Sequence, residues 1–261
     1  MIEIPWLGVT LVLAIFAASL LGLRAYRRAR SPDPEWLRKL LHLAMGIVAL
    51  ACPWLFIAVW PVLLLAIGLV SFLIALKFSA SLKRSFGGVV DAVERESLGE
   101  IYFPVSVALL FLLSAGDPTL FCIPVLILTL PDTAAALVGR RYGRLRYQSF
   151  GSTKSAAGSL AFLVVAFPAI YIPLVLFAGA GLGEAFLISL TLSLLLMLIE
   201  AVAARGLDNL FLPLGAFFLL RLYLRLEAHK LAAHLGVAIF LSILFGYFCL
   251  RSSRRPQGGL V

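Results

Sequence analysis

The chain has 261 residues, of which 62% are hydrophobic and 13% are charged, and its formal net charge is +9. This composition leaves too little polar surface to cover a soluble globule, so it excludes an ordinary soluble domain. It predicts an all-α polytopic membrane protein, whose excess of basic residues attracts anionic headgroups and nucleotides.

Membrane-spanning helices are predicted wherever about 20 apolar residues follow one another. Nine such windows occur, at 5–23, 38–57, 58–76, 101–115, 118–139, 157–179, 184–204, 209–226 and 231–250. The window 101–115 is short and 209–226 contains Arg221 and Arg225, so eight spans or a re-entrant segment remain as alternatives. The predicted organisation is one transmembrane domain over 1–250, followed by a flexible basic tail over 251–261.

The orientation is predicted from the lysines and arginines, which favour the cytosolic side of short loops. With the N-terminus outside, every Lys and Arg except Arg221, Arg225 and Lys230 falls on the cytosolic side. The first window has no basic residue before it and a basic cluster after it, which is typical of an uncleaved anchor. We therefore expect a multi-pass protein, in the cytoplasmic membrane if the chain is bacterial, with its functional loops in the cytosol.

An acidic residue and a basic loop stand out between residues 130 and 159. Asp132 lies inside an apolar window, where an ionisable group costs roughly 2.5–3.5 kcal/mol on insertion scales, so a functional role is expected. The loop that follows is rich in basic residues and glycines, namely Arg140, Arg141, Arg144, Arg146 and Lys154 with Gly139, Gly143, Gly151 and Gly158. Close backbone approach and positive charge suit a polyanion such as a nucleoside triphosphate.

Polar residues at the ends of other windows fall at the same predicted membrane face. They are Arg38, Lys39 and His42, Gly99 and Glu100, Lys154, Ser155 and Ser159, Glu200, and Asp208 with Asn209. Asp132 is seven residues before Gly139, which is about 10 Å along a helix, so it belongs to the same layer. In such a layer carboxylates can hold Mg²⁺ and Lys or Arg can neutralise phosphate oxygens.

The loop and its flanking blocks carry a family resemblance. Asp132, Ala135, Gly139 and Gly143 match in register the nucleotide signature of the CTP-dependent lipid-alcohol kinases, and Thr153–Gly158 takes the place of its final segment. The spacer is nine residues instead of eight, and Thr153 and Ala157 stand where the family has Lys and Glu. The blocks Arg38–His42, Gly99–Pro104 and Glu200–Leu214 are similar to blocks of the phytol-kinase-like members in the same order, so the resemblance covers about residues 36 to 215.

The resemblance implies an integral membrane kinase that transfers the γ-phosphate of CTP to a prenyl alcohol such as phytol, farnesol, geranylgeraniol or a polyprenol such as dolichol. The expected partners are the bilayer, the alcohol and CTP, with Mg²⁺ or another divalent cation as cofactor and no nucleic acid. The predicted catalytic residues are Asp132, Glu200, His42 and Glu100, and the predicted metal ligands are Asp132, Asp208, Glu200 and Asn209. The predicted nucleotide-binding residues are Ala135, Gly139, Arg140, Arg141, Gly143, Lys154, Ser155, Gly158, Ser159, Arg38 and Lys39. The proton acceptor stays open among Glu200, Glu100 and His42.

Several of these residues also have a purely structural interpretation. Gly139 and Gly143 form a G-x-x-x-G pair, which is typical of close helix packing. Lys154 and Ser155 do not form a Walker A loop, because Thr153 stands where that motif needs Gly. Free backbone N–H groups at a helix start near 155–159 nevertheless predict a seat for a phosphate.

Two other functions fit the composition. A phosphatidate cytidylyltransferase would need similar basic loops and carboxylates, although Gly206–Asn209 is only a faint match to that family's C-terminal signature. A transporter or flippase would use intramembrane acids for ion coupling, but no inverted repeat is visible and the acids gather at one face.

Overall fold

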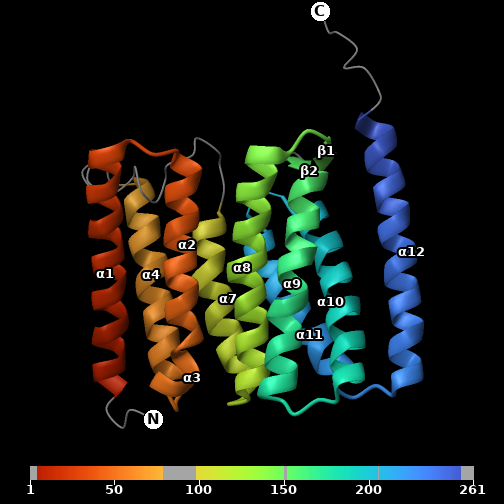
Figure 1. Ribbon diagram of the computed structural model, residues 1–261. Helices are drawn as coiled ribbons and strands as arrows, with labels where there is room; N and C mark the ends of the chain where they lie inside the picture. Colours follow the sequence, from red (N-terminus) through yellow and green to blue (C-terminus); the bar gives the residue numbers. More distant parts are fainter. Residues whose placement is uncertain (1–4, 79–97, 150–151, 205, 254–261) are drawn as a thin grey trace, which may run out of the picture.

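The structure, a computed structural model, describes residues 5–78, 98–149, 152–204 and 206–253 (Figure 1). Its elements in chain order are α1 (Pro5–Arg30), α2 (Pro34–Leu50), α3 (Cys52–Leu55), α4 (Trp60–Phe78), α7 (Gly99–Ser114), α8 (Pro118–Tyr142), β1 (Arg146–Ser149), β2 (Ser152–Ser155), α9 (Ala156–Leu176), α10 (Leu182–Val202), α11 (Asp208–Tyr223) and α12 (Ala228–Ser253). Each of the nine predicted apolar windows is helical.

Six helical segments are long and apolar enough to cross a membrane: α1, α2 with α3, α8, α9, α10 and α12. The helices α4 and α7 are shorter and also apolar. The predicted all-α polytopic membrane fold is therefore confirmed. Gly151, the connection 79–97 and residues 254–261 of the predicted tail lie outside the described residues, and α12 continues to Ser253, past the predicted start of that tail.

The basic residues gather at one end of the bundle. The end of α1, the start of α2, the end of α8 and the end of α12 all lie at the top of Figure 1. Arg27, Arg28 and Arg30 occupy the last turn of α1, Arg140 and Arg141 that of α8, and Arg251 that of α12. We call this the basic end; a cytosolic location for it remains a prediction.

Three helix starts are fixed by side-chain caps, which satisfy backbone N–H groups that the first turn leaves unpaired. Asp33 accepts a hydrogen bond from the N–H of Glu35 before α2, where Pro34 takes the first helical position. Asp117 accepts from Thr119 and Leu120 before α8, and Ser155 accepts from Gly158 before α9.

The helix α8 is the centre of the bundle, because it contributes to both large apolar clusters. Ile123 and Ile127 pack with residues of α9, α10 and α11, whereas Val125 and Leu128 pack with residues of α1, α2 and α7. A polar residue further along α8 therefore lies between the two halves of the protein, and Asp132 is only 4% exposed.

The helices α7 and α11 have 16 residues each, or about 24 Å of rise, and are shorter than their neighbours. Figure 1 shows α7 beginning well below the level that α8 reaches at the basic end. The side chain of Asn209 donates to the carbonyl of Gly99 at 2.7 Å, so the two helices begin at the same depth. Glu100 and Asp208, in the first turns of these helices, consequently lie below the basic end.

The segment expected to be a glycine-rich loop contains a two-stranded antiparallel hairpin, β1 and β2, at the basic end. Tyr147 pairs with Lys154 and Gln148 pairs with Thr153. Directly opposite residues of such a pair project to the same face, so the hairpin fixes the direction in which Lys154 points.

The contact between α2 and α8 depends on Gly46. A Cβ at this position would overlap the side chain of Thr129 on α8. Gly46→Ala is therefore expected to destabilise the protein by about 1–3 kcal/mol through overpacking, and thermal unfolding in detergent measures the effect. Gly68→Ala on α4 is the matched control, since a Cβ there meets nothing within 4 Å; equal unfolding temperatures for the two variants would contradict the described packing.

Candidate active site

Asp132 and Lys39 form a buried ion pair between α8 and α2. Lys39 Nζ donates to Asp132 Oδ2 at 2.6 Å, and the side chains of Lys39 and Asp132 are 4% and 5% exposed respectively. Lys39 was predicted to bind nucleotide and Asp132 to be catalytic. The structure brings them together and shows that one neutralises the other, which lowers the cost of placing Asp132 in an apolar environment.

His42 lies one helical turn from Lys39 on α2, against the same carboxylate. Its Nε2 is 2.9 Å from the carbonyl oxygen of Leu128 and 3.5 Å from Asp132 Oδ2. Because the carbonyl only accepts, this geometry assigns a hydrogen to Nε2 and leaves Nδ1 as the basic nitrogen. The ring also meets Phe103 edge-on, with 4.8 Å between centroids.

A second buried pair joins β2 to α10. Lys154 Nζ donates to Glu200 Oε1 at 2.7 Å and also to the backbone oxygen of Glu200. The hairpin and the last turn of α10 thus hold a lysine and a carboxylate together beneath the basic end. Both residues were predicted at the site.

The carboxylates interact electrostatically across the bundle. Glu200 interacts with Asp132 and Asp208, and Asp208 interacts with Lys154 and Lys39. Asp208 opens α11 and, within the described ranges, has no lysine or arginine at ion-pair distance. It is therefore the least neutralised acid of this layer. Glu100 at the start of α7 is in the electrostatic range of Arg38.

The predicted nucleotide-binding arginines all have contacts. Arg38 makes two hydrogen bonds to Glu35 and is partly buried. Arg140 pairs with Asp33, and both side chains are largely exposed, at 56% and 43%. Arg141 lies over the ring of Tyr142. Arg140 and Arg141 stand at the surface of the basic end, where they can meet an incoming anion.

The small residues of the signature pack α8 against α9. A Cβ on Gly158 would come within 2.8 Å of the carbonyl oxygen of Ala135 and 3.3 Å of Gly139 Cα. A Cβ on Gly143 would overlap the carbonyl of Gly139 and approach Ser155. The described contacts thus confirm close helix packing by the G-x-x-x-G pair. Contact of these residues with a nucleotide stays a prediction.

The predicted seat of free N–H groups at the start of α9 is occupied in part by the protein itself. Ser155 takes the N–H of Gly158 at 3.2 Å, and the N–H of Ala156 donates to the carbonyl of Leu145 at 2.9 Å. The prediction of free donors is therefore wrong for these two groups. The cap and the hairpin use the donors that a helix start otherwise leaves to a ligand.

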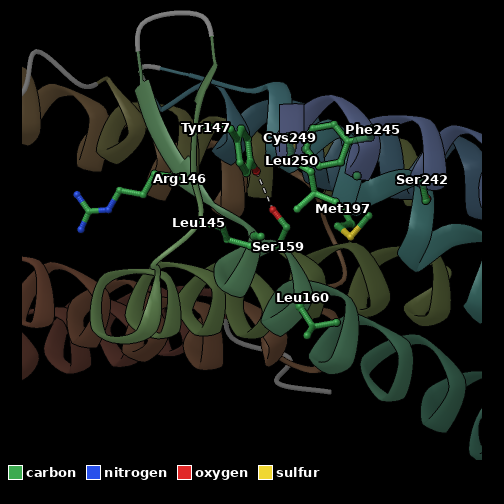
Figure 2. A pocket seen from close by; sticks show the side chains of 12 residues that line it. Leu145, Arg146, Tyr147, Ser159, Leu160, Met197, Ser242, Phe245, Cys249 and Leu250 are labelled. Atoms are coloured by element: carbon green, nitrogen blue, oxygen red, sulfur yellow. Dashed lines mark hydrogen bonds between the residues drawn. The ribbon is translucent and has the colours of Figure 1, made fainter. Parts of the chain in front are cut away.

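Ser159 turns toward a cavity of about 240 Å³ between the hairpin, α9, α10 and α12. Figure 2 shows its hydroxyl hydrogen-bonded to that of Tyr147, at 2.7 Å. Burial raises the pKa of Tyr147 above its usual value, although the Ser159 hydrogen bond opposes the shift. The tyrosine is consequently a neutral hydroxyl at physiological pH.

A smaller cavity of about 50 Å³ lies between α1, α2, α4 and α7. Its polar lining consists of four predicted site residues, Arg38, His42, Glu100 and Asn209. Asn209 ties α11 to α7 through Gly99, as described above, and Ser106 donates to the Asn209 carbonyl at 2.5 Å. The predicted metal ligand Asn209 therefore has a structural role.

Metal-binding chemistry is present only in part. The described residues contain no group of three or more His, Cys, Asp or Glu side chains that could hold an ion together. Mg²⁺ often needs only one or two protein carboxylates, with substrate phosphates and water completing its coordination. Asp208 fits that limited role, whereas Asp132 is paired with Lys39 and Glu200 is paired with Lys154.

Comparison with known proteins finds a similar kinase. A phytol kinase from Synechocystis sp. is 29% identical over 217 residues, which cover 81% of this chain and 89% of that protein. The chain is a relative of the phytol and polyprenol kinases. No protein-family model matches the sequence, and no solved structure matches it. The kinase relationship confirms the family resemblance based on the Asp132 signature, and it does not favour the cytidylyltransferase alternative.

Sequence reasoning missed three contributors to this kinase-like site. Glu35 pairs with Arg38, and Asp33 pairs with Arg140. The Asp-Pro-Glu sequence, which is typical of a helix start, was the sequence feature that could have indicated these two acids. Tyr147 lies in the strand Arg146–Ser149, where exposed and buried residues alternate. That alternation was the signal for a strand, which the basic composition of the loop obscured.

Proposed function

We propose that this protein is a membrane-embedded kinase that transfers the γ-phosphate of CTP to the hydroxyl group of a prenyl alcohol. The observation that carries the proposal is the presence of two buried lysine–carboxylate pairs below the basic end, in a relative of phytol kinase. Phosphoryl transfer needs chiefly positioning and neutralisation of charge, which such pairs supply.

The nucleotide approaches from the basic end in this proposal. Arg140 and Arg141 meet the phosphates at the surface, and Lys154 binds a phosphate oxygen deeper in the bundle. Lys154 then exchanges part of its contact with Glu200 for the phosphate, which frees the carboxylate at the moment the substrates are both bound. Lys39 keeps its ion pair with Asp132 and acts as a positioning residue, which holds the Asp132 carboxylate in place.

The reaction joins the alcohol oxygen to the γ-phosphorus, breaks the bond between that phosphorus and the β–γ bridging oxygen, and releases CDP. The hydroxyl proton passes to a carboxylate, for which Glu200 is our proposal because it lies beside Lys154. A divalent cation held by Asp208 would neutralise phosphate charge, which leaves Glu200 to accept the proton. His42 is not chosen, because its described contacts join it to Asp132, Leu128 and Phe103 and not to the Lys154–Glu200 pair.

The position of the label in the product decides between kinase and cytidylyltransferase. The purified protein is incubated in lipid vesicles with Mg²⁺, prenyl alcohols, diacylglycerol and phosphatidic acid, and with CTP labelled at the γ- or the α-phosphate. We expect γ-label in a prenyl monophosphate and no α-label in lipid. Transfer of α-label to phosphatidic acid would establish a cytidylyltransferase, and failure to label any lipid from CTP, ATP or GTP would refute the kinase proposal.

A further inference from the structure

The 240 Å³ cavity has walls that suit a lipid chain. Leu160 of α9, Met197 of α10 and Phe245 of α12 surround it, and Figure 2 shows these side chains around one space. Pockets for small ligands are mostly apolar, with a few polar groups that orient the bound molecule. The two buried ion pairs do not occupy this space.

The cavity lies at the edge of the bundle, beside α12. In Figure 1, α12 stands at the edge, and it packs mainly against α10 and β1. The apolar rim residues Leu145, Leu160 and Leu250 are 49%, 59% and 49% exposed. A chain dissolved in the hydrocarbon core can therefore enter sideways, without crossing the basic end.

The polar end of the cavity adjoins the Lys154–Glu200 pair. Tyr147 stands directly opposite Lys154 in the hairpin, so both side chains project to one face. Tyr147 also interacts electrostatically with Glu200. A group bound at the Tyr147 hydroxyl consequently lies on the face of the hairpin that also carries Lys154, the partner of Glu200.

The chemistry of this polar end fits a neutral hydroxyl. One O–H of the Tyr147–Ser159 pair serves their mutual hydrogen bond, and the other O–H with the remaining lone pairs is available to a third hydroxyl. Arg146 is the charged residue among the lining side chains, and Figure 2 shows its guanidinium directed away from the cavity. A phosphate headgroup would find no cation directed into the cavity, whereas an alcohol finds matching donors and acceptors.

We propose that this cavity binds the apolar chain of the acceptor alcohol and presents its hydroxyl to Tyr147 and Ser159, beside Glu200. The assignment rests on the proposed kinase function, because it takes the acceptor of that reaction as the occupant. It makes α12 the helix that selects the alcohol by its chain.

Gly246 offers a direct test, because it lines the cavity and a Cβ there meets nothing within 4 Å. Gly246→Trp is expected to place an indole in this space, since the Cβ itself meets no neighbour. Gly236→Trp is the matched control, since Gly236 lies on the same helix, outside the cavity lining, with equally open surroundings. Wild type and both variants are reconstituted in phosphatidylcholine vesicles with a geranylgeraniol analogue that carries a diazirine on its chain.

We expect photolabelling of wild type and of Gly236→Trp within residues 242–250, and its displacement by unlabelled geranylgeraniol. Gly246→Trp should lose this labelling, and its KM for geranylgeraniol should rise about tenfold or more, with the KM for CTP unchanged. Equal labelling of the two variants, labelling confined to residues lining the 50 Å³ cavity, or labelling that geranylgeraniol does not displace would each overturn the assignment.

The labelling needs no turnover, so it separates the two proposals. Specific labelling of α12 without phosphoryl transfer would support the cavity assignment and refute the kinase. Transfer of phosphate without labelling of α12 would support the kinase and overturn the cavity assignment.

Discussion

Asp132→Asn is expected to lower turnover at least about 100-fold, a loss typical of removing a preorganised electrostatic group from an active site. The same change leaves Lys39 buried without its carboxylate partner, which lies 2.6 Å away in the native protein. Breaking such a pair by removing one member costs about 3–5 kcal/mol. The single variant should therefore be both inactive and less stable, as measured by phosphoryl transfer and thermal unfolding.

A double variant separates these two effects. Lys39→Met with Asp132→Asn removes both charges, so stability should return toward that of the wild type while activity stays lost. Activity that returns with stability would show that Asp132 serves only to neutralise Lys39. Nearly full activity in Asp132→Asn alone would remove Asp132 from the active site.

Lys154→Met is expected to reduce kcat/KM for CTP about 100-fold, because it removes the deepest cation available to the phosphates and leaves Glu200 without its partner. Both kcat and the KM for CTP should change, since Lys154 contacts the nucleotide and holds the proposed proton acceptor. The KM for the alcohol should change little. Steady-state kinetics with each substrate varied in turn gives these values.

Lys230→Met provides the matched control for Lys154→Met. Lys230 is an exposed lysine in the first turns of α12, at the end of the bundle opposite the basic end. Its replacement removes the same charge and should leave both KM values near those of the wild type. A Lys154→Met enzyme with the kinetics of this control would show that Lys154 is only a structural partner of Glu200.

Local sequence signals predicted the helices and the depth of the acids well. An ionisable residue within an apolar window is costly, so Asp132 by its position in the chain indicated a site. The apolar windows located all nine long helices of the described ranges. These features depend on residues near one another in the chain, which is why composition and periodicity reveal them.

The pairings within the site were beyond such signals. Lys39 and Asp132 are 93 positions apart, and Lys154 and Glu200 are 46 apart, so their contacts depend on how four separate elements pack. The hairpin was missed because glycines and basic residues predicted a loop. The cavity beside Tyr147 depends on the loose packing of α12, which no single segment encodes.

The short helices α7 and α11 affect whether water or the alcohol accepts the phosphoryl group. Their recessed starts place Glu100 and Asp208 at the floor of the bundle's polar layer. In the proposed reaction, the donor phosphate descends to this floor while the alcohol arrives laterally from the hydrocarbon phase. The transferable phosphoryl group thereby meets an apolar acceptor where bulk solvent is scarce, so the depth of the site suppresses wasteful hydrolysis of CTP.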